Sequence, residues 1–145
     1  GANLIIADAD TVVLGRSGSR ISWIDDIPVV ACMIRRAVTA GLEVAFPLMG
    51  NVQLINAGAA VRSVEILAER GFEIDGNAIR HGLESCRWPC RMEVLQRSPL
   101  VIADGAHTSE SVRNLVLAVQ SLFGLQSARL VFGALGDVGA VHNLV

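Results

Sequence analysis

Short stretches near the start of the chain alternate hydrophobic and polar residues, which is the pattern of half-buried strands. The pattern covers Asn3 to Ala7, Thr11 to Leu14 and Arg20 to Ile24. Between the last two stretches, Gly15 to Ser19 has the composition of a hairpin turn. It is not expected to cradle a phosphate, because neither a helix pattern nor a lysine follows it. A small antiparallel sheet is therefore predicted.

The next stretch, from Pro28 to Ala40, contains a continuous apolar run that leaves two structures open. The run fits either a buried strand or a short helix that ends at Gly41, because periodicity does not distinguish the two structures. From Leu42 to Leu48 the alternation returns and predicts a strand that runs into Gly50.

From Gln53 to Arg70 apolar residues recur at spacings of three and four, which predicts an amphipathic helix. The apolar positions are Leu54, Ala57, Val61, Val64 and Leu67. Asn51 is expected to cap the N-terminus of this helix, and Gly71 occupies the C-cap position. Gln53 and Asn56 lie at i and i+3 in the first turn, so their side chains share a face of the helix.

A second short helix is predicted from Glu73 to Glu84, with Asp75 as its N-cap. His81 within it is expected to be a surface residue, since no metal-ligand partner lies at a suitable spacing. Further along, Ser109 to Phe123 has the periodicity of an amphipathic helix capped by Thr108 or by Ser109 itself.

Arg129 to Phe132 is predicted to form a strand after this last helix. With the strand that begins at Leu100, it would complete a β-α-β unit of right-handed crossover. The sequence therefore predicts an α/β fold.

Two short apolar runs, starting at Met92 and Leu100, predict strands with chemically useful groups at their ends. Arg91 precedes the first run, and Asp104 and His107 follow the second. Open α/β sheets place ligands beyond strand ends, where turns leave backbone N–H groups facing a crevice. We therefore expect the functional residues in this part of the chain.

Composition narrows the class of protein. The 145 residues are 52% hydrophobic and 18% charged, which favours a packed body over a disordered tail. A net charge of −2 gives no electrostatic reason to expect nucleic acid or an anionic membrane as partner. No stretch reaches the ~18 apolar residues of a membrane helix, and a cytoplasmic protein is expected. Cys32, Cys86 and Cys90 match neither a CxxC pair nor a zinc pattern and are expected to be reduced thiols.

Two motifs in this order are specific. The first is Trp88-Pro89-Cys90-Arg91-Met92-Glu93-Val94, and the second is Asp104-Gly105-Ala106-His107. Together they resemble the folylpolyglutamate synthase and dihydrofolate synthase family, a branch of the Mur ligase superfamily. That family carries Trp-Pro-Gly-Arg-x-Glu-Val and then Asp-Gly-Ala-His-Asn-Pro. This chain departs from the pattern at Cys90, Thr108 and Ser109.

A third segment resembles the same family. Its members carry Gly-x-His-Gln-x-x-Asn-Ala at this distance before the Trp-Pro motif, and Gly50, Gln53, Asn56 and Ala57 match it. Val52 stands where the family has His. In the family the two amides line the adenine pocket of ATP, a role that suits carboxamides because each offers a donor and an acceptor.

The resemblance implies a fold and a reaction. Residues 1–87 would be the tail of a Mur-ligase-type central ATPase domain, and residues 88–145 the beginning of a Rossmann-like C-terminal α/β domain. Family members use MgATP to activate a folate or dihydropteroate carboxylate as an acyl phosphate. The amine of L-glutamate then attacks it. The chain is therefore expected to be part of an ATP-dependent, amide-forming ligase of folate biosynthesis and one-carbon metabolism.

The resemblance also assigns roles to the residues at the strand ends. Arg91 matches the interdomain arginine that reaches the γ-phosphate, and a planar guanidinium holds two phosphoryl oxygens at once. Asp104 would contact the nucleotide, and His107 the acyl phosphate or the incoming glutamate. From the residues alone, a surface Arg91 paired with Glu93, a turn-forming Asp104 and a capping His107 remain open.

All twelve basic residues are arginine, so the lysine of a phosphate-binding loop is absent from this chain. The phosphate loop and the Mg²⁺ ligands are therefore expected in the remainder of the ligase, and the chain alone is expected to be inactive. Two alternatives stay open: a non-catalytic Mur-ligase-like binding or structural remnant, and a Mur-type peptide ligase.

Overall fold

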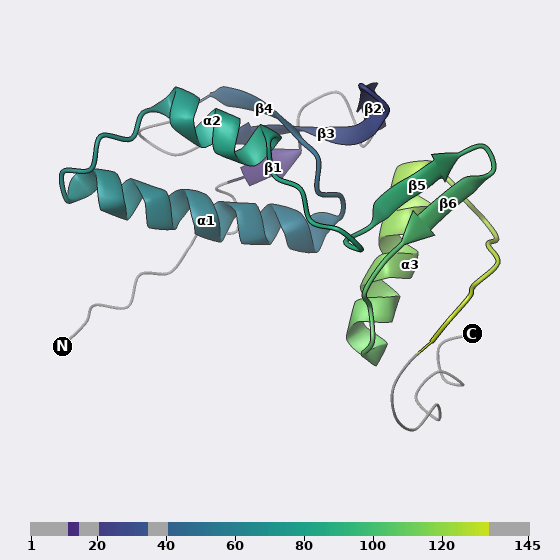
Figure 1. The fold of residues 1–145 in the computed structure, drawn as a ribbon. Helices are drawn as coiled ribbons and strands as arrows, with labels where there is room; N and C mark the ends of the chain where they lie inside the picture. Colours follow the sequence, from purple (N-terminus) through teal and green to yellow (C-terminus); the bar gives the residue numbers. More distant parts are fainter. Residues whose placement is uncertain (1–11, 15–20, 35–40, 134–145) are drawn as a thin grey trace. The chain divides into compact units, whose positions relative to one another are not determined.

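The computed structural model describes residues 12–14, 21–34 and 41–133 and divides the chain into two compact units, 1–87 and 88–145 (Figure 1). The predicted strand at 3–7, the predicted turn at 15–19 and the last part of the ambiguous run, 35–40, lie outside the described residues. Helices and strands occur in both units, which confirms the mixed α/β class. None of the helices in the described ranges is long and apolar enough to cross a membrane.

The first unit contains an antiparallel sheet built around one long strand. Its strands are β1 (Val12–Leu14), β2 (Ile21–Ile24), β3 (Ile27–Ile34) and β4 (Leu42–Phe46). Val30 of β3 pairs with Ile21 of β2 and with Phe46 of β4, so these two strands flank β3 on opposite sides. Strand β1 pairs with the other end of β3. The ambiguous run is thus a strand, and the sheet is antiparallel as predicted. The predicted hairpin between 11–14 and 20–24 is wrong, because β1 and β2 each pair with β3 and not with each other.

One face of this sheet forms the core of the first unit. The buried side chains on it are Val30, Cys32 and Ile34 from β3 and Val44 and Phe46 from β4. Cys32 lies directly opposite Val44, and Val30 opposite Phe46, so the alternation of both strands places these side chains on the same face. Met49, in the connection to the first helix, adds to this core.

Helix α1 spans Asn51–Glu69 and lies beside β1 and the second helix (Figure 1). The predicted cap is wrong by one residue: Gly50, with φ 96°, is the N-cap, and Asn51 is the first helical residue. A glycine adopts this backbone angle without a steric penalty. At the other end Arg70 is the C-cap, and Gly71 follows it with φ 94°.

The buried stripe of α1 also differs from the predicted one. The buried residues are Gln53, Ala57, Gly58, Val61 and Glu65, whereas Leu54 and Val64 are half-buried and Leu67 is exposed. Small residues at 57 and 58 allow this face to approach its neighbours closely. The two buried polar residues have polar partners one turn away, Asn56 for Gln53 and Arg62 for Glu65.

Helix α2 spans Gly76–Glu84 and packs along β4. Asp75 caps it as predicted, because its carboxylate accepts a hydrogen bond from the N–H of Ala78 at 2.7 Å. At its other end the carboxylate of Glu84 accepts a hydrogen bond from the N–H of Ala45 at 3.2 Å, which ties the helix to β4. His81 is exposed, as expected.

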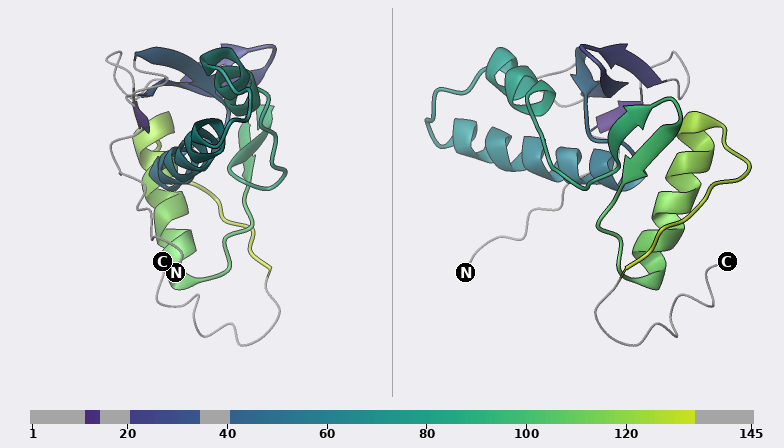
Figure 2. Two further views of the ribbon diagram at one scale, coloured as in Figure 1. Left: turned by 90° about the vertical axis from the view of Figure 1, so that its left-hand side faces the viewer. Right: turned by 45° about the vertical axis from the view of Figure 1, so that its right-hand side comes forward.

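The second unit begins with a hairpin of β5 (Glu93–Arg97) and β6 (Leu100–Ala103), and the two predicted strands are confirmed. Helix α3 follows at Ser109–Phe123 as one straight helix (Figure 2). The side chains of Thr108 and Ser111 form a reciprocal capping box, and Gly124 ends the helix in the left-handed conformation.

The strand predicted at Arg129 to Phe132 is wrong, since these residues form no strand in the structure. Val131 is 98% exposed and Leu130 59% exposed. A strand is stable only when a neighbour takes up its backbone hydrogen bonds, and no described strand pairs with this segment. The predicted β-α-β unit is therefore not formed within the described residues.

Candidate functional site

The first candidate residues are two amides at the start of α1. Gln53 is 8% exposed and Asn56 is exposed, one turn further along. The Nδ2 group of Asn56 donates a hydrogen bond to Oε1 of Gln53 at 3.2 Å. Gln53 is therefore a buried support for Asn56, which carries its amide on the surface of the first unit.

Apolar surface adjoins the exposed amide. Val52, one turn before Asn56, is 41% exposed, and Ile55 is 58% exposed. A carboxamide beside exposed aliphatic side chains suits a planar heterocycle, because the ring contacts the apolar groups while its polar edge meets the amide. Val52 is also the residue that replaces the histidine of the resembled motif.

The second set of residues surrounds Arg91, in the second unit. Its guanidinium lies over the ring of Trp88, 5.9 Å from the ring centroid, and both residues are exposed. A cation on an aromatic face at this distance is weakly stabilised and keeps its hydrogen-bond donors open. Within the described ranges the guanidinium forms no hydrogen bond and no ion pair. Apart from this contact with Trp88, no described group pairs with the positive charge of Arg91.

The expected alternative of an Arg91–Glu93 ion pair is not formed. Oε2 of Glu93 accepts a hydrogen bond from the N–H of Cys90 at 2.9 Å instead. Cys90 has φ 56° and Met92 has φ 48°, so the residues on both sides of Arg91 have left-handed backbone conformations. The backbone at Arg91 is thus unusual and is held in part by a carboxylate.

Asp104 joins the two sequence motifs. Its Oδ2 accepts a hydrogen bond from the N–H of Met92 at 2.8 Å, and its Oδ1 accepts one from the N–H of Ala106 at 2.7 Å. The N–H of Met92 belongs to the peptide group that follows Arg91. The structure therefore brings Asp104 against the backbone of Arg91, and both carboxylate oxygens already bind backbone N–H groups.

His107 lies in the turn between β6 and α3. Its Nδ1 donates to the carbonyl of Gly105 at 2.9 Å, and its backbone N–H donates to Oγ of Ser111 at 3.1 Å. The ring is exposed, and the bond at Nδ1 leaves Nε2 as the nitrogen that faces outward. Because Gly105 in turn donates to the carbonyl of Cys90 at 2.8 Å, His107 belongs to the same hydrogen-bonded loop cluster.

Sequence reasoning missed two members of this cluster. Trp88 and Glu93 were matched as motif residues, but neither received a role. Trp88 supports the guanidinium of Arg91, and Glu93 holds the N–H of Cys90. Glu93 follows Cys90 by three residues, the spacing at which a side chain commonly turns back to a backbone N–H, and this was the available signal.

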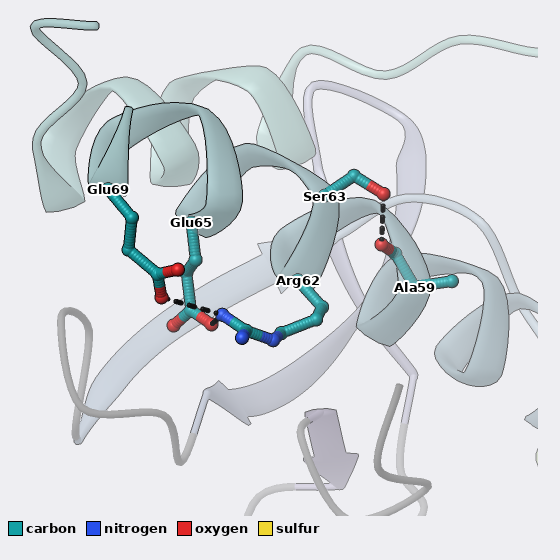
Figure 3. A network of polar contacts seen from close by, with 5 residues as sticks. All are labelled: Ala59, Arg62, Ser63, Glu65 and Glu69. Carbon is teal, nitrogen blue, oxygen red and sulfur yellow. Dashed lines mark hydrogen bonds and ion pairs between the residues drawn. The ribbon is translucent and has the colours of Figure 1, made fainter. Parts of the chain in front are cut away.

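A second charged cluster lies on α1, away from its first turn. NH1 of Arg62 is 3.0 Å from Oε1 of Glu69 and 3.4 Å from Oε2 of Glu65, and Glu65 is buried (Figure 3). Hydrogen bonding with Glu69 is the main cause that raises the pKa of Arg62. We assign this cluster to stability, because its charges are paired with each other.

No metal site is formed by the described residues. They contain no group of three or more His, Cys, Asp or Glu side chains arranged to hold a metal ion. The carboxylates of the Arg91 region bind backbone N–H groups, as at Asp104 and Glu93, which is not the arrangement of a Mg²⁺ site.

Comparison with known proteins gives several relatives, although no protein-family model matches the chain. It is 30% identical over 96 residues to the folylpolyglutamate synthase of Lacticaseibacillus casei, which covers 66% of this chain and 22% of that protein. It is 33% identical over 96 residues to the dihydrofolate synthase/folylpolyglutamate synthase of Bacillus subtilis, with the same two coverages, 66% and 22%. The chain thus spans about a fifth of the length of these two curated relatives.

The fold has matching solved structures. The folylpolyglutamate synthase of Mycobacterium tuberculosis complexed with ADP superposes with a TM-score of 0.53 and 27% sequence identity. The match covers 75% of this chain and 22% of that one. The sequence comparison and the structure comparison therefore both find folylpolyglutamate synthases.

Proposed function

Since the chain belongs, over the region it spans, to the folylpolyglutamate synthase and dihydrofolate synthase family, we propose that it is part of an ATP-dependent ligase that adds L-glutamate to folate or dihydropteroate. The first unit is the tail of the central ATPase domain, and the second is the beginning of the C-terminal domain. The reaction forms an acyl phosphate on the substrate carboxylate, and the amine of glutamate displaces the phosphate.

The observation that carries this proposal is the free guanidinium of Arg91. Within the described residues it has no carboxylate partner, and it is supported by Trp88 on one side. The loop that carries it is tied to the second motif through Asp104. A fold that holds the backbone of an arginine this firmly and leaves its charge unpaired suits recognition of a phosphoryl group.

The candidate residues contact different parts of the nucleotide or the substrate. Gln53 and Asn56 read the adenine base, Arg91 stabilises charge on the γ-phosphate, and Asp104 shapes the loop and contacts the nucleotide. His107 presents Nε2 to the acyl phosphate or to the incoming glutamate. Positive charge near the transferring phosphoryl group is the main catalytic requirement of this chemistry, and Arg91 is the group that supplies it here.

Two components of the reaction are not carried by the residues described. The lysine of a phosphate-binding loop has no counterpart, because the sequence contains no lysine. The described residues also do not fit a Mg²⁺ site. We therefore assign the phosphate loop and the metal ligands to the rest of the ligase.

A second candidate is a non-catalytic Mur-ligase-like remnant. Cys90 replaces a motif glycine at a position where the backbone has φ 56°, a conformation that favours glycine. Val52 replaces the motif histidine. Both departures favour a binding module that has lost catalytic function.

One experiment separates the two candidates. The region of the Lacticaseibacillus casei enzyme that this chain matches is replaced by the chain, and addition of glutamate to folate is measured. A ligase segment gives a chimera whose activity is lost on Arg91→Ala. A folded chimera that binds ATP and forms no product contradicts the ligase proposal and favours the remnant.

A further inference from the structure

Arg91 lies between two residues in a strained backbone conformation. Cys90 has φ 56° and Met92 has φ 48°, and neither is a glycine. The left-handed region is unfavourable for an ordinary residue, because its Cβ approaches the backbone too closely. Such angles persist only where surrounding contacts hold them in place.

The other pair of left-handed residues in the described ranges has a simpler cause. Asp25 (φ 47°) and Asp26 (φ 62°) form the two-residue turn between β2 and β3. A type I′ hairpin turn has positive φ at both of its central positions, and Asp tolerates this conformation. Cys90 and Met92 precede a strand and are separated by Arg91, so a hairpin turn does not explain them.

Three contacts hold the backbone around Arg91. The carbonyl of Cys90, in the peptide group before Arg91, accepts a hydrogen bond from the N–H of Gly105 at 2.8 Å. The N–H of Met92, in the peptide group after Arg91, donates to Asp104 at 2.8 Å. The carboxylate of Glu93 accepts from the N–H of Cys90 at 2.9 Å. Both peptide groups of Arg91 are therefore fixed, and a carboxylate binds the N–H of each left-handed residue.

These contacts do not serve to bury the loop. Cys90, Arg91 and Trp88 are all exposed, and only the side chain of Met92, at 5% exposure, is anchored in the interior. A strained, exposed loop that carries an unpaired cation is typical of a binding site. Packing of the hairpin alone requires neither the strain nor the carboxylate of Glu93.

We propose that Glu93 is a positioning residue, which acts together with Asp104 to hold the two left-handed residues beside Arg91 and so directs the guanidinium towards a phosphoryl group. This inference rests on the proposed function of Arg91 as a phosphate contact. It adds a role for Glu93 and gives Asp104 a positioning role through its bond to Met92.

The test uses the full chain and inorganic tripolyphosphate as the probe. Binding is followed by NMR through the indole N–H of Trp88, which lies beside the guanidinium. We expect Glu93→Ala to weaken tripolyphosphate binding about tenfold, the lower end of what loss of an orienting partner costs at other sites. Glu93→Gln is expected to retain the affinity, because its carbonyl oxygen still accepts from Cys90. Glu110→Ala, which removes an exposed carboxylate of the same unit, is the matched control.

A rescue experiment distinguishes positioning from simple loss of charge. In the double variant Cys90→Gly, Glu93→Ala, glycine adopts the left-handed conformation without help, so affinity is expected to return to within about twofold of the unaltered chain. If Glu93→Ala weakens binding and Cys90→Gly does not restore it, the positioning role is overturned. Because Glu93→Gln keeps the hydrogen bond, loss of affinity in that variant also overturns it, even if Glu93→Ala fails to fold.

The remaining outcomes separate this inference from the proposed function. If Arg91→Ala abolishes binding while Glu93→Ala leaves it unchanged, Arg91 contacts the phosphate and the role of Glu93 is overturned alone. If tripolyphosphate binds the unaltered chain and Arg91→Ala with equal affinity, or binds neither, the phosphate role of Arg91 fails, and the present inference fails with it.

Discussion

The side-chain amide of Asn56 donates a hydrogen bond to the side-chain carbonyl of Gln53 at 3.2 Å, and Gln53 is buried while Asn56 is exposed. This bond fixes which end of the Asn56 amide faces the protein. The carbonyl oxygen and one N–H of Asn56 remain open to a ligand. An acceptor next to a donor complements the amino group and the ring nitrogen on an edge of adenine. Guanine presents two acceptors on the equivalent edge, so the arrangement favours adenine.

Replacing Gln53 with Leu removes the acceptor that orients Asn56. We expect the preference of the chain for ATP over GTP to fall about tenfold, because a correctly oriented amide is worth this much in discrimination between purines. Gln53→Glu retains an acceptor for Asn56 and is expected to keep the preference. The two dissociation constants are measured by NMR titration of the backbone amides of α1.

Two outcomes would contradict the roles of Gln53 and Asn56. If Gln53→Leu and the unaltered chain prefer ATP to the same extent, Asn56 does not depend on Gln53. If the unaltered chain shows no preference and Asn56→Ala binds ATP equally well, these amides do not read the base.

Asp104 is the acceptor for two backbone N–H groups, those of Met92 and Ala106. Asparagine offers one carbonyl oxygen and an amino group that cannot accept, so Asp104→Asn leaves one N–H facing a donor. We expect the free energy of unfolding of the second unit to fall by about 2 kcal/mol. Hydrogen exchange at Met92 or Ala106 is expected to accelerate by a corresponding factor, which NMR measures directly.

Asp75→Asn is the matched control for this substitution. Asp75 accepts only from Ala78, and asparagine is as good an N-cap as aspartate. Its effect on stability is expected to stay below about 0.5 kcal/mol. Equal protection of Met92 and Ala106 in Asp104→Asn and the unaltered chain would show that Asp104 does not hold this loop.

Local signals explain what the sequence predicted correctly. Helix α3 begins and ends where its pattern indicates, because the cap at Thr108 and the glycine at Gly124 are decided within a few residues. The strand expected at Arg129 to Phe132 failed because a strand depends on a distant partner. The stripe of α1 was misjudged because the buried Glu65 is paired with Arg62, a pairing that hydrophobicity does not reveal.

The sequence also predicted one part of the candidate site and missed another. The order of the two motifs predicted that Arg91 and Asp104 lie near each other, and the bond from Met92 to Asp104 places them there. The positive φ angles beside Arg91 leave no mark in the sequence when Cys90 replaces the motif glycine. The spacing of three residues between Cys90 and Glu93 allows the side chain to reach the backbone, but the structure is needed to show that it supports a left-handed residue.

Cys32 is 1% exposed, and burial raises the pKa of its thiol from the ordinary 9.0 to about 12. The thiolate is the reactive form, so Cys32 is expected to resist iodoacetamide in the folded chain at pH 8.5. Cys90 is exposed and is expected to be alkylated first, which peptide mass spectrometry resolves. Alkylation of Cys32 at the same rate as Cys90 in folded protein would contradict its burial.

The raised pKa of Cys32 also predicts how stability depends on pH. The folded state favours the neutral thiol, so this contribution is complete below pH 9 and is lost as pH rises from about 9 towards about 12. Cys32→Ala removes the titrating group and is expected to flatten the fall in denaturation midpoint over this range. A fall of equal steepness in Cys32→Ala and the unaltered chain would assign the effect to other groups.

Arg62 is expected to stabilise the first unit, because it forms an ion pair with the buried carboxylate of Glu65 (Figure 3). Arg62→Gln removes this ion pair from a buried carboxylate, so the urea midpoint of the first unit should fall. Glu69→Gln should have a smaller effect, since the Glu69 side chain is 59% exposed and solvent screens its interaction with Arg62. Arg70→Gln, which removes an exposed charge from the C-cap of the same helix, is the control for loss of net positive charge. Equal midpoints for Arg62→Gln and Arg70→Gln would mean that the burial of Glu65 does not depend on Arg62.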